Sequence, residues 1–177
     1  MVAQSVEREH LAYGPDSGPK PFSSIQPGDC AVLEKRISAE AIEAFALLSG
    51  DRNPLHVDGT FASQTAFNKP VAHGMLLGAY LSTLIGMHLP GPGALWTQQS
   101  LRWLSPVFAG DVVRLSLRVV HKSPGIRTLK VQVEAINQNG AIVMNGDGLV
   151  MTVEQRDTET GKPAGENVAL LTAPTGE

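Results

Sequence analysis

The sequence predicts an α+β fold in which an antiparallel β-sheet wraps around one long central α-helix. Residues 74–88 read GMLLGAYLSTLIGMH and are apolar on every side over roughly 22 Å of helix, so this helix needs protein around it. Residues 113–119 and 129–135 alternate apolar and polar side chains, which is typical of strands with one dry face. The turns between the expected strands are too short for parallel crossovers, which favours antiparallel pairing.

The bulk composition fits one globular domain. The chain has 177 residues, of which 42% are hydrophobic and 18% charged, so one packed core is possible. A formal net charge of -3 provides no basic surface for nucleic acid or an anionic membrane. Cys30 is the single cysteine, and Glu7, Arg8 and Glu9 stand where a signal peptide would need apolar residues. We expect a cytoplasmic protein that binds neither nucleic acid nor membrane.

The two ends differ in composition from the middle. Residues 14–28 are rich in Pro and Gly, which favours extended and poorly packed chain. Residues 154–177 are polar and rich in turn-forming residues. We therefore expect an N-terminal arm over residues 1–28, a folded domain over residues 29–153, and a flexible C-terminal tail over residues 154–177.

One strand and two short helices are expected before the long helix. Residues 30–37 alternate as a short strand does. A helix should follow, with Ser38 as its N-cap and Gly50 as its left-handed end. The apolar residues that recur at helical spacing in it are Ile42, Phe45 and Leu48. Asp58 can cap a second short helix that extends to Ala66.

Strands should follow the long helix. Residues 96–104 are one candidate. The NQNG segment at 137–140 predicts a hairpin turn that leads into a strand over residues 141–153. Within that strand, NGDG at 145–148 predicts a bulge or the close approach of another backbone.

The long helix itself has two distinctive features. LPGPG at 89–93 ends the apolar run well short of the about 20 residues that a membrane span needs, so we prefer a helix surrounded by protein. Gly74, Gly78, Ser82 and Gly86 fall at steps of four and form a stripe of small side chains that another element can approach closely. Tight packing against a sheet is a sufficient explanation for Gly78 and Gly86.

The segment SGDRNPLH, residues 49–56, holds a carboxylate and an imidazole five positions apart. Asn53 and Pro54 restrict the backbone between Asp51 and His56, so that the two side chains can converge. The pattern alone leaves two interpretations open, an acid/base pair or turn residues without chemistry. The five histidines lack the H-x-x-x-H or carboxylate spacing typical of zinc or iron, and we expect no metal.

Three stretches together resemble a known family. FALLSGDRNPLHVDGTFAS, FNKPVAHGML and SLRWLSPVFAGD resemble the MaoC-like hydratases, in particular the (R)-specific enoyl-CoA hydratases. The resemblance covers residues 41–120 and continues weakly to 153. It implies the hot-dog fold, an antiparallel sheet around a long central helix, and hydration of trans-2-enoyl-CoA to (3R)-hydroxyacyl-CoA.

The resemblance also implies roles for individual residues. Hydration of an enoyl thioester needs a base, an acid and a donor to the thioester oxygen. Asp51 and His56 are expected to be the acid/base pair that holds the water, and the Gly74 N–H the oxyanion donor at the positive end of a helix dipole. Supporting roles are implied for Asn53, His73 and Ser82, and an acyl pocket with Gly78, Ile85 and Val150.

A coenzyme A thioester is then the substrate, and no cofactor or metal is expected. Arg52, Lys69 and Arg102 are candidates to hold the coenzyme A end. Because hot-dog domains generally pair edge strands, a homodimer or higher homo-oligomer is expected. Two alternatives stay open. One is a dehydratase of unusual or carrier-protein-bound 3-hydroxyacyl thioesters. The other is a hot-dog thioesterase or a non-catalytic acyl-binding module.

Overall fold

The computed structural model describes residues 19–153, so residues 1–18 of the expected arm and the whole expected tail lie outside the described residues. In chain order the elements are η1 (Phe22–Ser24), β1 (Cys30–Arg36), α1 (Ala39–Ser49), α2 (Pro54–Val57), α3 (Gly59–Ser63), α4 (Gly74–Thr83), η2 (Leu84–His88), β2 (Ala94–Trp103), β3 (Val112–Ser123), η3 (Pro124–Ile126), β4 (Thr128–Asn137) and β5 (Ile142–Thr152).

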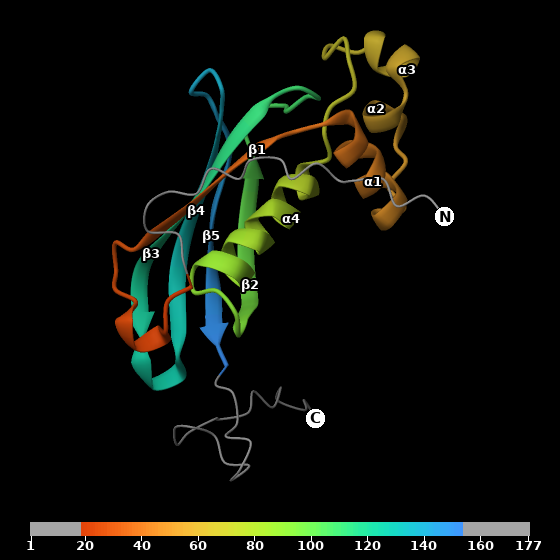
Figure 1. The fold of residues 1–177 in the computed structure, drawn as a ribbon. Helices are drawn as coiled ribbons and strands as arrows, with labels where there is room; N and C mark the ends of the chain where they lie inside the picture. The colour runs from red at the N-terminus through yellow and green to blue at the C-terminus, as the bar shows by residue number, and fades with distance from the viewer. Residues whose placement is uncertain (1–18, 154–177) are drawn as a thin grey trace, which may run out of the picture.

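The five strands form one antiparallel sheet in the order β1-β3-β4-β5-β2. The sheet bends around α4, which lies against one of its faces, while α1, α2 and α3 gather beyond the N-terminal end of α4 (Figure 1). The core fills the space between sheet and helix, with Leu115, Leu117 and Val131 from the strands and Leu77 and Leu81 from α4 all buried. The predicted α+β architecture is confirmed.

α4 and η2 form one helical segment over residues 74–88, as predicted, but its last turn is a π-helix. The side chains buried against the sheet are Leu76, Leu77, Leu81, Leu84 and Ile85. Met75 and Met87 are 53% and 59% exposed, so the expectation of burial on every side is wrong for the single chain. Within residues 19–153, no helix is long and apolar enough to cross a membrane.

Within the stripe of small residues, Gly74 lets β2 approach the start of α4 closely. A Cβ atom added at Gly74 would lie 2.6 Å from Trp103 Nε1, whereas one added at Gly78 would make an ordinary contact of 3.9 Å with Leu101 Cδ1 and lie nearer, at 3.2 Å, to Met75 Cε of α4 itself. Four helical residues advance about 6 Å and two strand residues about 6.6 Å, so alternate residues of β2 meet successive turns of α4. A Cβ atom at Gly86 would meet nothing within 4 Å, so the packing explanation does not extend to Gly86.

The NGDG segment of β5 is a place of close backbone approach, as predicted. A Cβ atom added at Gly146 would overlap the carbonyl oxygen of Ser100, and one at Gly148 would lie 2.6 Å from that of Gln98. The neighbouring irregularity lies in β2, where the pairing register shifts between Trp96 and Gln98. Because Gly146 and Gly148 have no side chain, β2 can lie close to β5.

Residues 19–28 pack onto the domain, and the expectation of poorly packed chain is wrong for them. Phe22 is 8% exposed and Ile25 is fully buried in the core. Lys122 Nζ and the Arg127 guanidinium carbon lie 4.8 and 4.9 Å from the centroid of the Phe22 ring. Prolines set the path of this segment, but its two large apolar side chains make it part of the core.

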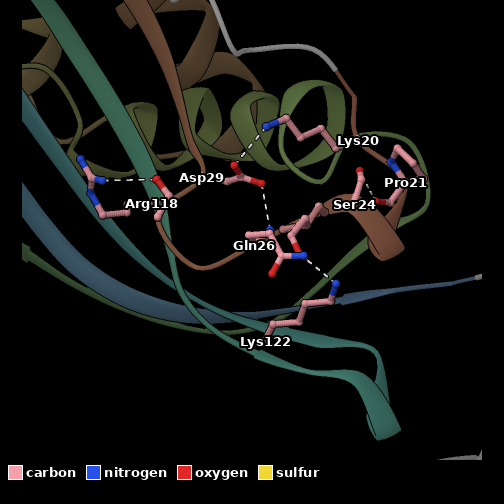
Figure 2. A network of polar contacts seen from close by, with 9 residues as sticks. Lys20, Pro21, Ser24, Gln26, Asp29, Arg118 and Lys122 are labelled. Carbon is pink, nitrogen blue, oxygen red and sulfur yellow. Dashed lines mark hydrogen bonds and ion pairs between the residues drawn. The ribbon is translucent and has the colours of Figure 1, made fainter.

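Polar contacts hold the same segment in place (Figure 2). Lys122 Nζ donates to the carbonyl oxygens of Ser23 and Ile25 at 3.1 and 2.8 Å. The Asp29 carboxylate accepts the Gln26 N–H at 3.0 Å and pairs with Lys20 Nζ at 3.1 Å. The start of the described chain is therefore tied to β3 and to the beginning of β1.

The short helices begin as the sequence predicts. Ser38 Oγ accepts the Ala41 N–H at the start of α1, and Gly50 ends that helix with φ 77°. Asp58 accepts two N–H groups at the start of α3, but α3 ends at Ser63 rather than at Ala66. Leu48 is 86% exposed, so the apolar face of α1 stops before its last turn.

Candidate active site

Two side-chain caps shape the connection between α1 and α3. The Asp51 carboxylate accepts the Asn53 N–H at 3.2 Å, and Asn53 Oδ1 accepts the Leu55 N–H at 3.1 Å. Pro54 occupies the first turn of α2, where its missing N–H costs nothing. The segment expected to be a loop is therefore a turn followed by a short helix, and this helix carries His56.

Val71 clamps α2 to the segment that leads into α4. Its N–H donates to the Leu55 carbonyl at 3.1 Å, and its own carbonyl oxygen lies 2.6 Å from His56 Nδ1. Ala72 N–H donates to the Val107 carbonyl at 2.7 Å, which anchors this segment in turn. Because a carbonyl oxygen only accepts, His56 Nδ1 carries the hydrogen, and in the neutral ring Nε2 keeps its lone pair.

His73 contacts both Asp51 and His56. Its Nε2 is 2.9 Å from the Asp51 carbonyl oxygen, and its ring centroid is 4.0 Å from that of His56. The same ring packs against Phe45 at 5.1 Å and is only 2% exposed. By the same argument Nε2 donates, and Nδ1 is a buried atom without a hydrogen-bond partner among residues 19–153.

An open cavity of about 530 Å³ lies in front of these residues. Asp51, His56, His73 and Gly74 are all part of its lining. The apolar part of the lining consists chiefly of Phe45, Phe67, Leu77, Trp103, Leu104 and Val107. An apolar cavity with a few convergent polar groups is the usual form of a small-molecule site.

The first residue of α4, Gly74, lines this cavity and carries an unpaired N–H group. His73 is the N-cap residue of α4 but its side chain makes no capping hydrogen bond. Among residues 19–153, no acceptor pairs with the Gly74 N–H. Free N–H groups and the positive end of the helix dipole attract a developing negative charge.

Asp51, His56 and His73 are also a group of metal-ligand type, with one ligand atom of each within 4.8 Å of the others. The spacing argument from the sequence could not reveal this group, because the fold brings His73 to the pair. His56 Nδ1 and His73 Nε2 are already bonded to carbonyl groups, and His73 Nδ1 is buried. Asp51 and His56 both line the cavity, and His56 Nε2 has no hydrogen-bond partner among residues 19–153, so the donor set suits a water molecule better than a cation.

Several predicted site residues lie outside the cavity lining. Ser82 is exposed, two turns or about 12 Å along α4 from Gly74. Gly78 faces β2, and Ile85 and Val150 are buried in the closed core at 2% and 0% exposure. The structure brings together Asp51, His56, His73 and Gly74, and leaves Ser82, Gly78, Ile85 and Val150 apart from them.

The three basic residues expected to hold the coenzyme A end are not in the lining of this cavity either. Arg52 pairs with Glu43 at 3.2 Å. Lys69 Nζ lies 4.2 Å from the centroid of the Phe108 ring. Arg102 lines a polar groove on the sheet together with Arg118 and Glu134. The other walls of this groove come from β3, β4 and β5.

Sequence reasoning gave no role to Val71 or Trp103, although both lie in the stretches that resemble the family. Val71 acts through its backbone, which no side-chain pattern reveals. Trp103 follows Leu101 at strand spacing, and the apolar alternation at the end of β2 was the available signal. Its contact with Gly74 depends on how β2 is aligned along α4.

A sheet wrapped around one central helix, with a carboxylate and an imidazole beside the start of that helix, defines a hot-dog protein with a single candidate active site in the described residues. The chain belongs to the MaoC-like family: the model of the MaoC like domain matches residues 27–141.

Similar proteins agree with this assignment. The chain is 42% identical to an (R)-specific enoyl-CoA hydratase of Aeromonas caviae, over 72% of this chain and 95% of the relative. It is 31% identical to a 3-hydroxybutyryl-CoA dehydratase of Methylorubrum extorquens, over 78% of this chain and 87% of the relative. A solved (R)-hydratase from Pseudomonas aeruginosa has a TM-score of 0.73 at 34% identity, covering 82% of this chain and 90% of that one.

Proposed function

We propose that this protein catalyses the (R)-specific, reversible hydration of trans-2-enoyl-CoA to (3R)-hydroxyacyl-CoA. The observation that carries the proposal is the meeting of Asp51, His56 and Gly74 on one cavity. The 42% identity to an (R)-specific enoyl-CoA hydratase supports the substrate class and the stereochemistry. The reaction adds water to a double bond, and acid/base groups with an oxyanion donor are sufficient for it.

The polar groups suit the steps of this reaction. A water molecule between the Asp51 carboxylate and His56 Nε2 gives up a proton to the pair as its oxygen bonds to C3. The electrons of the C2–C3 double bond move toward the thioester oxygen, where the Gly74 N–H stabilises the negative charge. A proton from the pair then bonds to C2 and the carbonyl group re-forms. The enzyme ends in its starting protonation state.

Two further residues support this arrangement. Asn53 caps α2 and so fixes the helix that carries His56. His73 holds the Asp51 backbone through its Nε2–H and packs its ring against the His56 ring. We assign both to positioning. The exposed place of Ser82, away from the cavity, favours no such role for it.

The closed core suggests a short acyl chain. An acyl group that extended along α4 toward Ile85 and Val150 would have to displace close-packed side chains, which is costly. We therefore infer a preference for short acyl chains, held by the apolar lining of the cavity.

We also propose that two copies pair through the free edge of β2. β2 is the last strand of the sheet, and unpaired edges are ready to accept another strand. Leu95 on β2 is 50% exposed and Met87 on the adjoining η2 is 59% exposed, so apolar surface lies beside this edge.

The test follows the loss of ultraviolet absorbance of the conjugated enoyl thioester with CoA substrates of increasing chain length, and determines the configuration of the hydroxyl group. We expect turnover of crotonyl-CoA, falling rates for long chains, and (3R) products. Free thiol release would identify a thioesterase instead. Turnover only of carrier-protein-bound substrates would favour the dehydratase alternative, and ligand binding without turnover would indicate an acyl-binding module.

A further inference from the structure

The indole of Trp103 lies against the start of α4. Trp103 is the last residue of β2 and pairs with Met144 of β5, so its backbone position is set by the sheet. From the Cβ position of Gly74, Trp103 Nε1 is 2.6 Å away, Cε2 2.8 Å and Cδ1 3.0 Å. The nitrogen-bearing edge of the indole, rather than its six-membered ring, therefore faces the helix start.

This contact places two N–H groups close together. A backbone nitrogen and its own Cβ position are about 2.5 Å apart, so Trp103 Nε1 lies within about 5 Å of the Gly74 nitrogen. One oxygen atom can sit about 2.9 Å from both nitrogens at that separation. Both residues line the cavity that contains Asp51 and His56.

Neither N–H group has an acceptor within the described part of the chain. An indole nitrogen can only donate, and the Trp103 side chain is partly exposed to the cavity rather than sealed in the core. The other tryptophan differs in this respect, because Trp96 Nε1 donates to Gln99 Oε1 at 3.0 Å. Trp103 is thus the tryptophan with a donor available for a ligand.

We propose that Trp103 Nε1–H is a second donor to the thioester oxygen and acts together with the Gly74 N–H. The inference rests on the proposed hydratase function. As the water oxygen bonds to C3, the C2–C3 electron pair moves toward the thioester oxygen, and two donors share the resulting charge. The negative charge leaves the thioester oxygen when C2 takes a proton from the acid/base pair. The indole therefore keeps its own hydrogen throughout. The donor strengthens as charge develops and acts mainly on kcat.

The direct test is Trp103→Phe, which keeps an aromatic ring in place and removes the N–H. Trp96→Phe is the matched control, because it changes the same residue type on the same strand away from the cavity. We expect Trp103→Phe to lower kcat for crotonyl-CoA about tenfold to a hundredfold with KM changed less than about threefold. Trp96→Phe should stay within about twofold of the unaltered protein. Thermal unfolding checks that both variants fold.

A second replacement preserves the shape of the side chain. The chain has two tryptophans, so in the Trp96→Phe protein all remaining tryptophan is at position 103. Expression of that protein with benzothienylalanine in place of tryptophan exchanges the N–H for sulfur at this one position. We expect the same loss of kcat as for Trp103→Phe.

Infrared spectroscopy gives a readout that packing alone would not move. The carbonyl stretch of an enoyl-CoA labelled with carbon-13 at the thioester is measured on the Asp51→Asn protein, in which turnover is slow. We expect a higher stretching frequency when Trp103→Phe is added, because one hydrogen bond to the oxygen is lost.

An unchanged kcat, a rise in KM alone, or an unchanged carbonyl band would each overturn the donor role of Trp103. If the unaltered protein hydrates no enoyl thioester, the proposed function itself fails and this inference fails with it. Hydration by the unaltered protein with no effect at position 103 removes only the assignment of Trp103.

Discussion

His56 and His73 each use one ring nitrogen to donate to a backbone carbonyl. The two bonds position different parts of the candidate site. For His56, which lines the cavity, the bond to Val71 fixes the tautomer and leaves the lone pair of Nε2 available. For His73, the bond fixes the main chain of Asp51 and leaves its other nitrogen buried. Asp51 and His56 are thus positioned through the main chain. One ligand-type atom of each lies within 4.8 Å of the other, a separation that one water molecule can bridge.

The proposed acid/base pair can be tested with single substitutions. Asp51→Asn and His56→Ala should each lower the hydration of crotonyl-CoA by on the order of a hundredfold or more, because each removes a group that moves a proton or holds the water. Steady-state rates measure the effect, and circular dichroism checks the fold. Asp147→Asn and His121→Ala, on the exposed face of the sheet, are the controls. Near-normal turnover in either correctly folded site variant would contradict the mechanism.

At the level of elements, the contact between β2 and the start of α4 joins the sheet to the site. Gly74→Ala would place a Cβ atom 2.6 Å from Trp103 Nε1, so the indole must move. We expect crotonyl-CoA turnover to fall at least about tenfold while the free energy of unfolding falls by only about 1 kcal/mol, since an exposed indole can rotate away.

Gly86→Ala is the matched control for this change, because a Cβ atom there meets nothing within 4 Å. It should leave turnover unaltered and raise the free energy of unfolding by up to about 1 kcal/mol, since alanine favours helix over glycine. Kinetics and urea unfolding of both variants measure the difference. Equal effects of the two substitutions on turnover would argue against a special role for the contact at Gly74.

A pH-dependent contact holds the first described residues to the sheet. The hydrogen bond from the Gln26 N–H, together with Lys20, lowers the pKa of Asp29, although partial burial opposes the shift. A carboxyl group whose pKa is lower in the folded state stabilises the fold above its unfolded pKa of about 3.9, and this stabilisation is lost as the pH falls through the lowered value.

Asp29→Asn should therefore lower the free energy of unfolding by about 1 kcal/mol at pH 7, with the difference shrinking in acid. Urea unfolding of both proteins between neutral and acidic pH measures it. Lys130→Gln, on the exposed face of β4, is a control for surface charge. A difference that stays constant into acid would show that the Asp29 carboxylate is not its source.

At the scale of the whole molecule, the uncovered apolar side chains beside β2 bear on assembly. We expect sedimentation equilibrium to give about twice the 18.8 kDa mass of the chain. Met87→Lys places a charge beside the proposed contact and should shift the mass toward the monomer. Ile126→Lys, on the exposed turn η3, should leave the mass unchanged. A monomeric unaltered protein at high concentration would contradict the pairing.

The sequence was most informative where the physical signal is local. The apolar run of residues 74–88, the alternation in β3 and β4, and the caps at Ser38 and Asp58 all predict elements that the structure contains. Asp51 and His56 lie in one short segment, so their convergence was also predictable. The clamp at Val71 and the indole at Gly74 depend on contacts between distant segments, which no local pattern encodes.

In the N-terminal segment, composition alone gave the wrong prediction. Prolines and glycines predicted an extended, poorly packed arm up to residue 28, yet Phe22 and Ile25 fill part of the core. A recombinant protein shortened to begin at Asp29 would lose both side chains and uncover the apolar surface beneath them. Such a version should aggregate or melt early, so crystallisation and assay work on a trimmed chain needs to retain residues from Pro19 onward.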